Sequence, residues 1–100
     1  MKLQGEEHEY TLSAASNYAN SLVGLQRFEE AKALLRKIIP AARRVLGKVH
    51  EITLRMEANY AAALGDNPSA TLNEIREAVS TLEEIDRTAR RVFGGAHPFT

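Results

Sequence analysis

The pattern of apolar and polar positions along this chain predicts helices and no sheet. In four separate stretches apolar side chains recur every three or four residues, which is the spacing of one face of an α-helix. In the last and longest stretch this face consists of Leu72, Ile75, Val79, Leu82, Ile85, Ala89 and Val92. We therefore expect helices at about 8–24, 28–46, 51–65 and 69–93, with ends placed to within about 2–4 residues.

Two features of the second stretch affect the packing that we expect. Charged residues such as Lys32 and Arg36 fall off its apolar face, so we expect them in solvent. Pro40 lies inside the stretch. Proline removes one backbone hydrogen bond and clashes with the preceding turn, so we expect a kink or a break there. Gly47 is expected to end this helix.

The four expected helices form an internal repeat. The segment 5–12 aligns with 47–54, an offset of 47 − 5 = 42 residues, whereas His50 aligns with His97 at an offset of 97 − 50 = 47. The second unit therefore carries five extra residues, which we place within 65–70. The last helix can begin at Asn67 with Pro68 in its first turn, or at a capping box of Thr71 and Glu74. We interpret the chain as one domain, 1–100, with unit one at 5–46, unit two at 47–94 and the start of a third at 95–100.

The repeated residues resemble the tetratricopeptide repeat. Its signature positions hold Tyr18, Ala19, Leu22, Phe28, Ala31 and Leu35 in the first unit, and Tyr60, Ala61, Leu64, Ile75, Ala78 and Leu82 in the second. The 42-residue spacing and the junction 46–50 are similar to those of the kinesin light chain type. This resemblance implies an all-α fold, a right-handed superhelical solenoid of antiparallel helix pairs. It also implies a noncatalytic scaffold that binds a protein or peptide in a concave groove.

Two asparagines at equivalent positions are the main candidates for binding. The resemblance implies that Asn17 and Asn59 face the groove, where an amide can both donate to and accept from a peptide main chain. The alternative is that they bond only to the neighbouring helix. Helical geometry gives the other expected groove residues, which are Ser13, Ser16, Asn20, Arg55, Ala58 and Ala62. This lining suits a peptide of mixed character.

The three histidines recur at the junctions between helix pairs. They could form a metal cluster, but one histidine per junction places His8, His50 and His97 a whole repeat apart. We therefore favour a hydrogen-bonding or capping role and expect no metal and no cofactor. The arginines and lysines alternate with acidic residues along the helices, which is typical of a solvated face rather than an anion-binding stripe.

Composition narrows the class of partner. Thirteen basic and thirteen acidic residues cancel, so nothing in the net charge favours nucleic acid or an anionic membrane. No cysteine is present, which excludes disulfides and thiol catalysis. No side chains stand in a recognisable catalytic arrangement, so we expect a cytoplasmic protein that is not an enzyme. The alternative is a structural or regulatory segment beside an enzyme domain that is absent from this chain. The last helix carries more apolar surface than one neighbouring helix pair can cover, so we expect the chain to be a fragment of a longer array. Alone it is expected to be either marginally stable or self-associated through its repeat ends.

Overall fold

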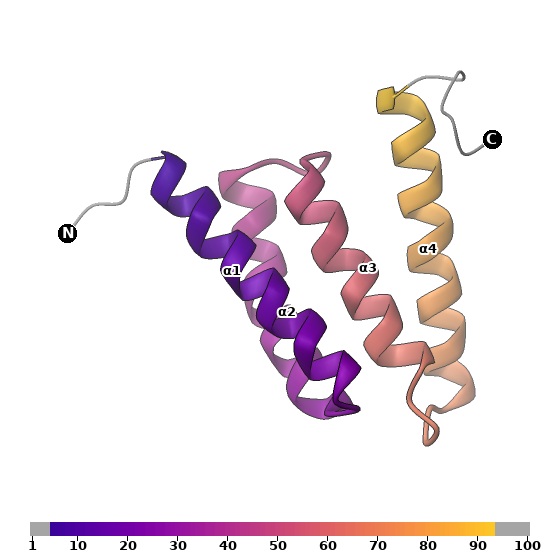
Figure 1. The fold of residues 1–100 in the computed structure, drawn as a ribbon. Helices are drawn as coiled ribbons and strands as arrows, with labels where there is room; N and C mark the ends of the chain where they lie inside the picture. The colour runs from indigo at the N-terminus through magenta and orange to yellow at the C-terminus, as the bar shows by residue number, and fades with distance from the viewer. Residues whose placement is uncertain (1–4, 94–100) are drawn as a thin grey trace.

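The computed structural model describes residues 5–93, and it consists of four helices joined by short loops (Figure 1). They are α1 (Gly5–Gly24), α2 (Phe28–Val45), α3 (Glu51–Gly65) and α4 (Leu72–Phe93). No strand occurs between residues 5 and 93. The prediction of an all-α fold is therefore confirmed, whereas the expected start of a third unit lies outside the described residues.

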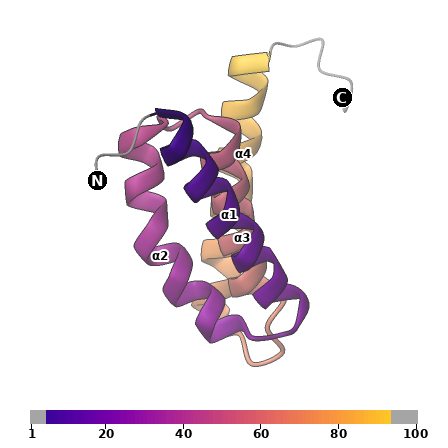
Figure 2. The same ribbon diagram turned by 60° about the vertical axis from the view of Figure 1, so that its left-hand side comes forward.

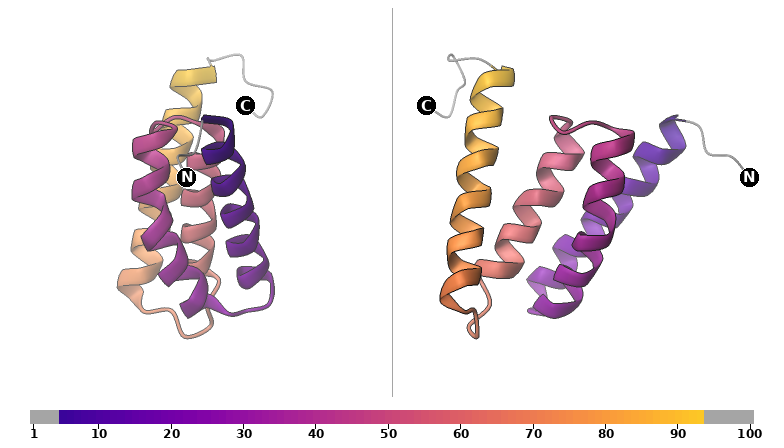
Figure 3. Two further views of the ribbon diagram at one scale, coloured as in Figure 1. Left: turned by 90° about the vertical axis from the view of Figure 1, so that its left-hand side faces the viewer. Right: turned by 180° about the vertical axis from the view of Figure 1, so that it is seen from behind.

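The helices form two antiparallel pairs that lie side by side. Helices α1 and α3 run in one direction, and α2 and α4 run in the other (Figures 1 and 3). Helix α2 contacts both α1 and α3, and α1 also contacts α3 directly (Figure 2). Within residues 5–93, the backbone of α4 packs closely on α3 alone. Helices α1, α2 and α3 each pack on at least two other helices, whereas α4 packs on one.

The core lies mainly among the first three helices. Its largest cluster of buried side chains consists of Leu12, Ala19, Leu35, Ile39, Ala42, Ile52 and Met56. A smaller cluster of Ala61, Leu64 and Ala78 joins α3 to α4. The contact there is close, because a Cβ atom added at Gly65 would lie 3.4 Å from the Cβ atom of Ala78. Small residues at these positions allow the helices to approach one another.

The observed helix ends agree with the predicted ends to within three residues, and the start of α4 is now decided. Helix α4 begins at Leu72 rather than 69, because Thr71 and Glu74 form the capping box. The Glu74 backbone N–H donates to Thr71 Oγ1 over 3.1 Å, and the Thr71 N–H donates to Glu74 Oε1 over 3.0 Å. Asn67 instead stabilises the loop, where its Oδ1 accepts from the Ser69 N–H over 3.0 Å.

The break expected at Pro40 and the solvent exposure expected for Lys32 both require correction, whereas a kink at Pro40 stays a prediction. The helix does not break at Pro40 but runs unbroken from Phe28 to Val45. Proline removes only one helical hydrogen bond, and the neighbouring Ile39 and Ala42 remain anchored in the core. The expectation that Lys32 lies in solvent is wrong as well. The residue is buried at 4% exposure, and its ammonium contacts the carboxylates of Glu29 at 2.8 Å and Glu74 at 2.7 Å.

One residue in the turn between α1 and α2 has an unfavourable backbone conformation. Gln26 has a φ of 63°, in the left-handed region that favours glycine. Its N–H donates to the Val23 carbonyl over 2.9 Å, and the Arg27 N–H donates to the Leu22 carbonyl over 2.8 Å. This pair of bonds is a Schellman motif, which closes the end of α1. The end of α2 is followed by glycine as predicted, and Gly47 has a φ of 102°.

Candidate functional site

The two repeated asparagines lie in different environments. Asn59 on α3 is half-buried and faces α1, where its Nδ2 donates to the Ser16 carbonyl over 3.3 Å and lies 3.5 Å from Ser16 Oγ. Asn59 therefore makes the bond to a neighbouring helix that the sequence offered as the alternative to a role in the groove. Asn17 is exposed on α1, which has no helix packed on its outer side within residues 5–93.

The remaining predicted groove residues divide by exposure. Asn20 and Arg55 are exposed, and Arg55 forms an ion pair with Glu51 at 3.1 Å. Half-buried are Ser13, Ala58 and Ala62. Ser16 is fully buried beneath Asn59, so its hydroxyl does not reach an open surface. The binding role of the predicted set stays a prediction.

His50 joins the first helix pair to the second. Its Nδ1 accepts a hydrogen bond from the Ile52 N–H over 3.1 Å, which caps the start of α3. Since Nδ1 is the acceptor, Nε2 carries the proton and donates to Glu9 Oε2 on α1 over 2.9 Å. The predicted capping role is confirmed for His50, and the side chains of His8 and His97 lie outside the described part of the chain. Among the described residues no group of three metal-binding side chains comes together.

Two adjoining depressions lie among α2, α3 and α4, and the sequence analysis did not predict them. Their volumes are about 160 and 260 Å³, and both are lined by Arg43, Glu57 and Glu84. Arg43 Nε donates to Glu57 Oε2 over 2.9 Å. In the larger depression Arg36 Nε donates to the Tyr60 hydroxyl over 3.1 Å, and this bond raises the pKa of Arg36. These contacts join different helices, so no spacing along one helix reveals them.

The apolar face of α4 is largely uncovered. Leu72 is 62% exposed, Ile75 44%, and Val79 and Leu82 50% each. Ala78 is the one buried residue in α4 between positions 72 and 92. The prediction that this helix carries more apolar surface than its neighbours cover is confirmed.

Antiparallel helix pairs that repeat along the chain and pack side by side define a helical repeat protein. Residues 11–51 match the family model described as Tetratricopeptide repeat. This span covers most of α1, all of α2 and the junction containing His50. The match supports the resemblance of this chain to tetratricopeptide repeat proteins.

Tetratricopeptide repeats generally mediate protein–protein interaction. No curated protein and no solved structure matches the chain. None of the helices described between residues 5 and 93 has the length and apolar character needed to cross a membrane.

Proposed function

We propose that this chain is a noncatalytic scaffold that binds a peptide or protein segment along the shared face of α1 and α3. The observation that supports the proposal is the repeated placement of accessible side chains on two parallel helices. Ser13 and Asn20 on α1 occupy the positions of Arg55 and Ala62 on α3, at an offset of 42 residues. The two helices run in the same direction (Figure 1), so we infer that equivalent positions face the same side of the molecule.

The chemistry of this face suits main-chain recognition. The exposed amides of Asn17 and Asn20 can each donate to and accept from a peptide backbone whatever side chains the peptide has. Arg55 adds a cation that can contact a carboxylate or a carbonyl. Its present partner Glu51 is 76% exposed, and an exposed pair of this kind is weak enough for a ligand to displace it.

Selection from a random peptide library displayed on phage, followed by calorimetry with the selected synthetic peptides, would test the proposal. We expect Asn17→Ala and Asn20→Ala each to weaken binding by about 0.5–1.5 kcal/mol, the net contribution of a hydrogen bond. Lys37→Ala is the matched control, because Lys37 is also exposed but lies on α2. Failure to select any peptide, or equal affinity in all variants, would contradict the proposal.

The effect of Asn59→Ala has to be measured on stability and not only on peptide binding. Since its amide bonds to the Ser16 carbonyl, Asn59→Ala removes a contact between α1 and α3 whether or not a peptide binds. We therefore expect this variant to lower the melting temperature, which Asn17→Ala should leave unchanged.

Several finer features belong to the same proposal. We place the unit boundaries at residues 46 and 47, expect the pairs to continue a right-handed superhelix, and expect similarity to the kinesin light chain type and a cytoplasmic location. We also propose that copies of the chain associate through the exposed repeat ends. The role of a regulatory segment beside an enzyme domain stays the alternative prediction.

A further inference from the structure

The exposed face of α4 is the repeat equivalent of the face of α2 that is buried. At the offset of 47 residues, Ile75 and Leu82 occupy on α4 the positions of Phe28 and Leu35 on α2. Phe28 and Leu35 are 7% and 0% exposed, whereas Ile75 and Leu82 are 44% and 50% exposed. The difference has a simple cause, because α2 packs against both α1 and α3, whereas within residues 5–93 the backbone of α4 lies close to α3 alone and α4 meets α2 through the Lys32–Glu74 ion pair.

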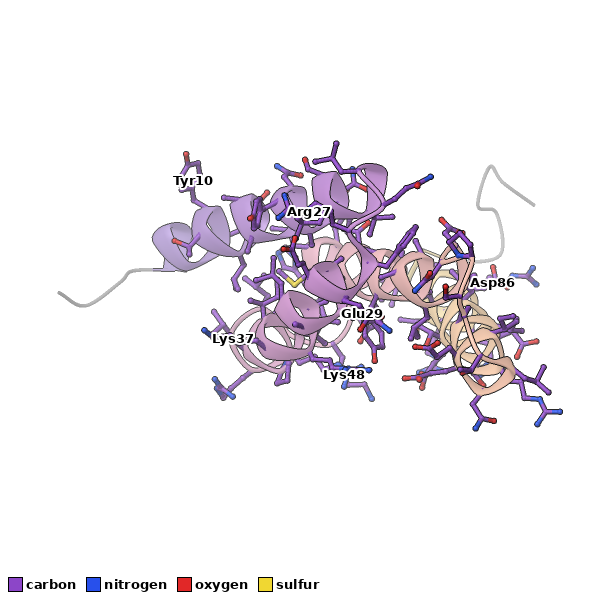
Figure 4. All side chains as sticks on the ribbon, turned by 90° about the horizontal axis from the view of Figure 1, so that it is seen from below. Tyr10, Arg27, Glu29, Lys37, Lys48 and Asp86 are labelled. Carbon is purple, nitrogen blue, oxygen red and sulfur yellow. The ribbon has the colours of Figure 1, made fainter. Side chains whose placement is uncertain are left out.

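Helix α1 carries the complementary half of the same contact. At the offset of 42 residues, Tyr10 and Tyr18 occupy on α1 the positions of Ile52 and Tyr60 on α3. Ile52 and Tyr60 pack in the cluster that contains Leu35 of α2. Tyr10 and Tyr18 are 77% and 59% exposed, and Tyr10 points away from the other helices at the edge formed by α1 (Figure 4).

We propose that copies of this chain associate head to tail, with α1 of one copy packed on α4 of the next as α3 packs on α2. The inference gives a geometry to the self-association named under the proposed function and rests on that part of it, but not on the peptide-binding face. The two contacting surfaces differ from each other. The contact is therefore heterologous, and it extends into a chain of copies or a ring rather than closing as a twofold dimer.

The sequence of α4 places the apolar part of this contact at the start of the helix. Val79 stands at the position of Lys32, so α4 is more apolar there than α2. Asp86 stands at the position of Ile39 and pairs with Arg90 at 3.2 Å. The apolar surface that a second copy can cover therefore runs from Leu72 to Leu82.

The end of α1 matches that surface. A helix packed antiparallel on α4 places its last turns against the first turns of α4. The last turns of α1 carry Tyr18, and Leu25 follows directly after the helix. Leu25 is 67% exposed. Glu83 stands at the position of Arg36, which donates to the Tyr60 hydroxyl. In the contact between copies the Tyr18 hydroxyl donates to the Glu83 carboxylate instead, so the polar pair is kept with its direction reversed.

Complementary surface variants distinguish this arrangement from other modes of association. Leu82→Glu blocks the α4 face, and Tyr18→Glu blocks the α1 face. In sedimentation velocity over a concentration series, the wild-type mass should rise beyond that of a dimer. Each variant alone should stay monomeric. An equimolar mixture should form a one-to-one dimer that does not grow, because it joins the two intact faces once.

The controls separate failure of the geometry from failure of the fold. Both substituted side chains are at least half exposed, so circular dichroism should show unchanged helix content, and Lys37→Glu on α2 should associate like the wild type. If Tyr18→Glu still dimerises while Leu82→Glu does not, two α4 faces meet and the head-to-tail arrangement is wrong. A wild type that is monomeric at every concentration also overturns it, and binding of a selected peptide to that monomer would leave the peptide-binding proposal standing.

Discussion

The ammonium of Lys32 lies 2.7 Å from Oε2 of Glu74 and thereby joins α2 of the first helix pair to the first turn of α4. The second oxygen of the same carboxylate, Oε1, accepts the Thr71 N–H of the capping box. One side chain therefore both starts α4 and holds it against the preceding pair. The lysine side chain is 5% exposed and the glutamate 24%, so the contact is shielded from water at the lysine end.

We expect Glu74→Ala to lower the melting temperature more than Glu29→Ala does. Both carboxylates contact Lys32, but Glu29 is 78% exposed and lies on the same helix as the lysine. Removing Glu74 also removes half of the capping box and the tie between α2 and α4. Thermal unfolding by circular dichroism measures the difference. Equal shifts in the two variants would show that the tie between the pairs and the capping box together contribute no more than the contact of Glu29 with Lys32.

The same contact predicts loss of stability in acid. The hydrogen bond from Lys32, followed by that from the Thr71 backbone, holds the pKa of Glu74 below its ordinary value of 4.5. Because the folded pKa is the lower one, this contribution is present above pH 4.5 and is lost as the pH falls through the folded value. The melting temperature of the wild type should therefore exceed that of Glu74→Gln at neutral pH, and the gap should narrow as the pH falls below 4.5 and through the lower folded pKa.

At alkaline pH the contact loses its contribution to stability as the pH rises instead of as it falls. Hydrogen bonds to Glu29 and Glu74 raise the pKa of Lys32 above its ordinary value of 10.5. Its contribution is therefore present below that pH and is lost as the pH rises through the folded pKa. Between these limits the difference between the wild type and Glu74→Gln should stay constant, and a slope across neutral pH would contradict the assignment.

Two substitutions of His50 should lower the unfolding free energy by different amounts. His50→Ala removes both the cap of α3 and the bond to Glu9, whereas asparagine can still cap the helix. We expect the alanine variant to lose about 1 kcal/mol more unfolding free energy than His50→Asn, which is the usual value of a cap. Urea unfolding at neutral pH measures both. If the two variants are equally stable, the bond to the Ile52 N–H does not act as a cap.

The sequence predicted the helices well and the contacts between them less well, for physical reasons. Apolar periodicity and capping chemistry are local, so both ends of α3 agree with the prediction. The start of α4 stayed open because Asn67 and Thr71 both carry suitable capping side chains. The burial of Lys32 and Ser16 was missed because it depends on Glu74 and Asn59, which lie 42 and 43 residues further along the chain. Such partners are defined by the packing of helices and not by spacing within one helix.

Leu35 and Leu82 provide a direct test of which apolar face is covered. They are repeat equivalents, but Leu35 is 0% exposed and Leu82 is 50% exposed. We expect Leu35→Ala to cost about 2–5 kcal/mol, as in other buried cores. We expect Leu82→Ala to cost less than about 1 kcal/mol at concentrations where the chain is monomeric, since about half of its burial is absent. Urea unfolding would decide it, and equal costs would show that the face of α4 is covered in solution.

Gly24 and Gln26 lie at the end of α1, and a substitution at either position should stabilise the chain. Gly24 is helical, and a Cβ atom added there meets no atom within 4 Å. Gly24→Ala should therefore stabilise the chain by about 0.8–1 kcal/mol. Gln26 has a φ of 63°, so glycine would relieve about 1–2 kcal/mol of left-handed strain. The more flexible unfolded chain offsets about 0.4–1 kcal/mol of that gain.

These estimates predict whether each variant raises or lowers the urea midpoint of unfolding. Gly24→Ala and Gln26→Gly should both raise the urea midpoint, and their effects should add only partly because the sites share one helix end. Gly47→Ala is the control of opposite sign, because a φ of 102° strains any residue with a Cβ atom although its surroundings are open. Equilibrium unfolding of the three single variants and the double variant measures this order. A lower midpoint for Gly24→Ala would mean that the last turn of α1 is not helical in solution, and a lower midpoint for Gln26→Gly would mean that the glutamine side chain stabilises the turn by more than its strain costs.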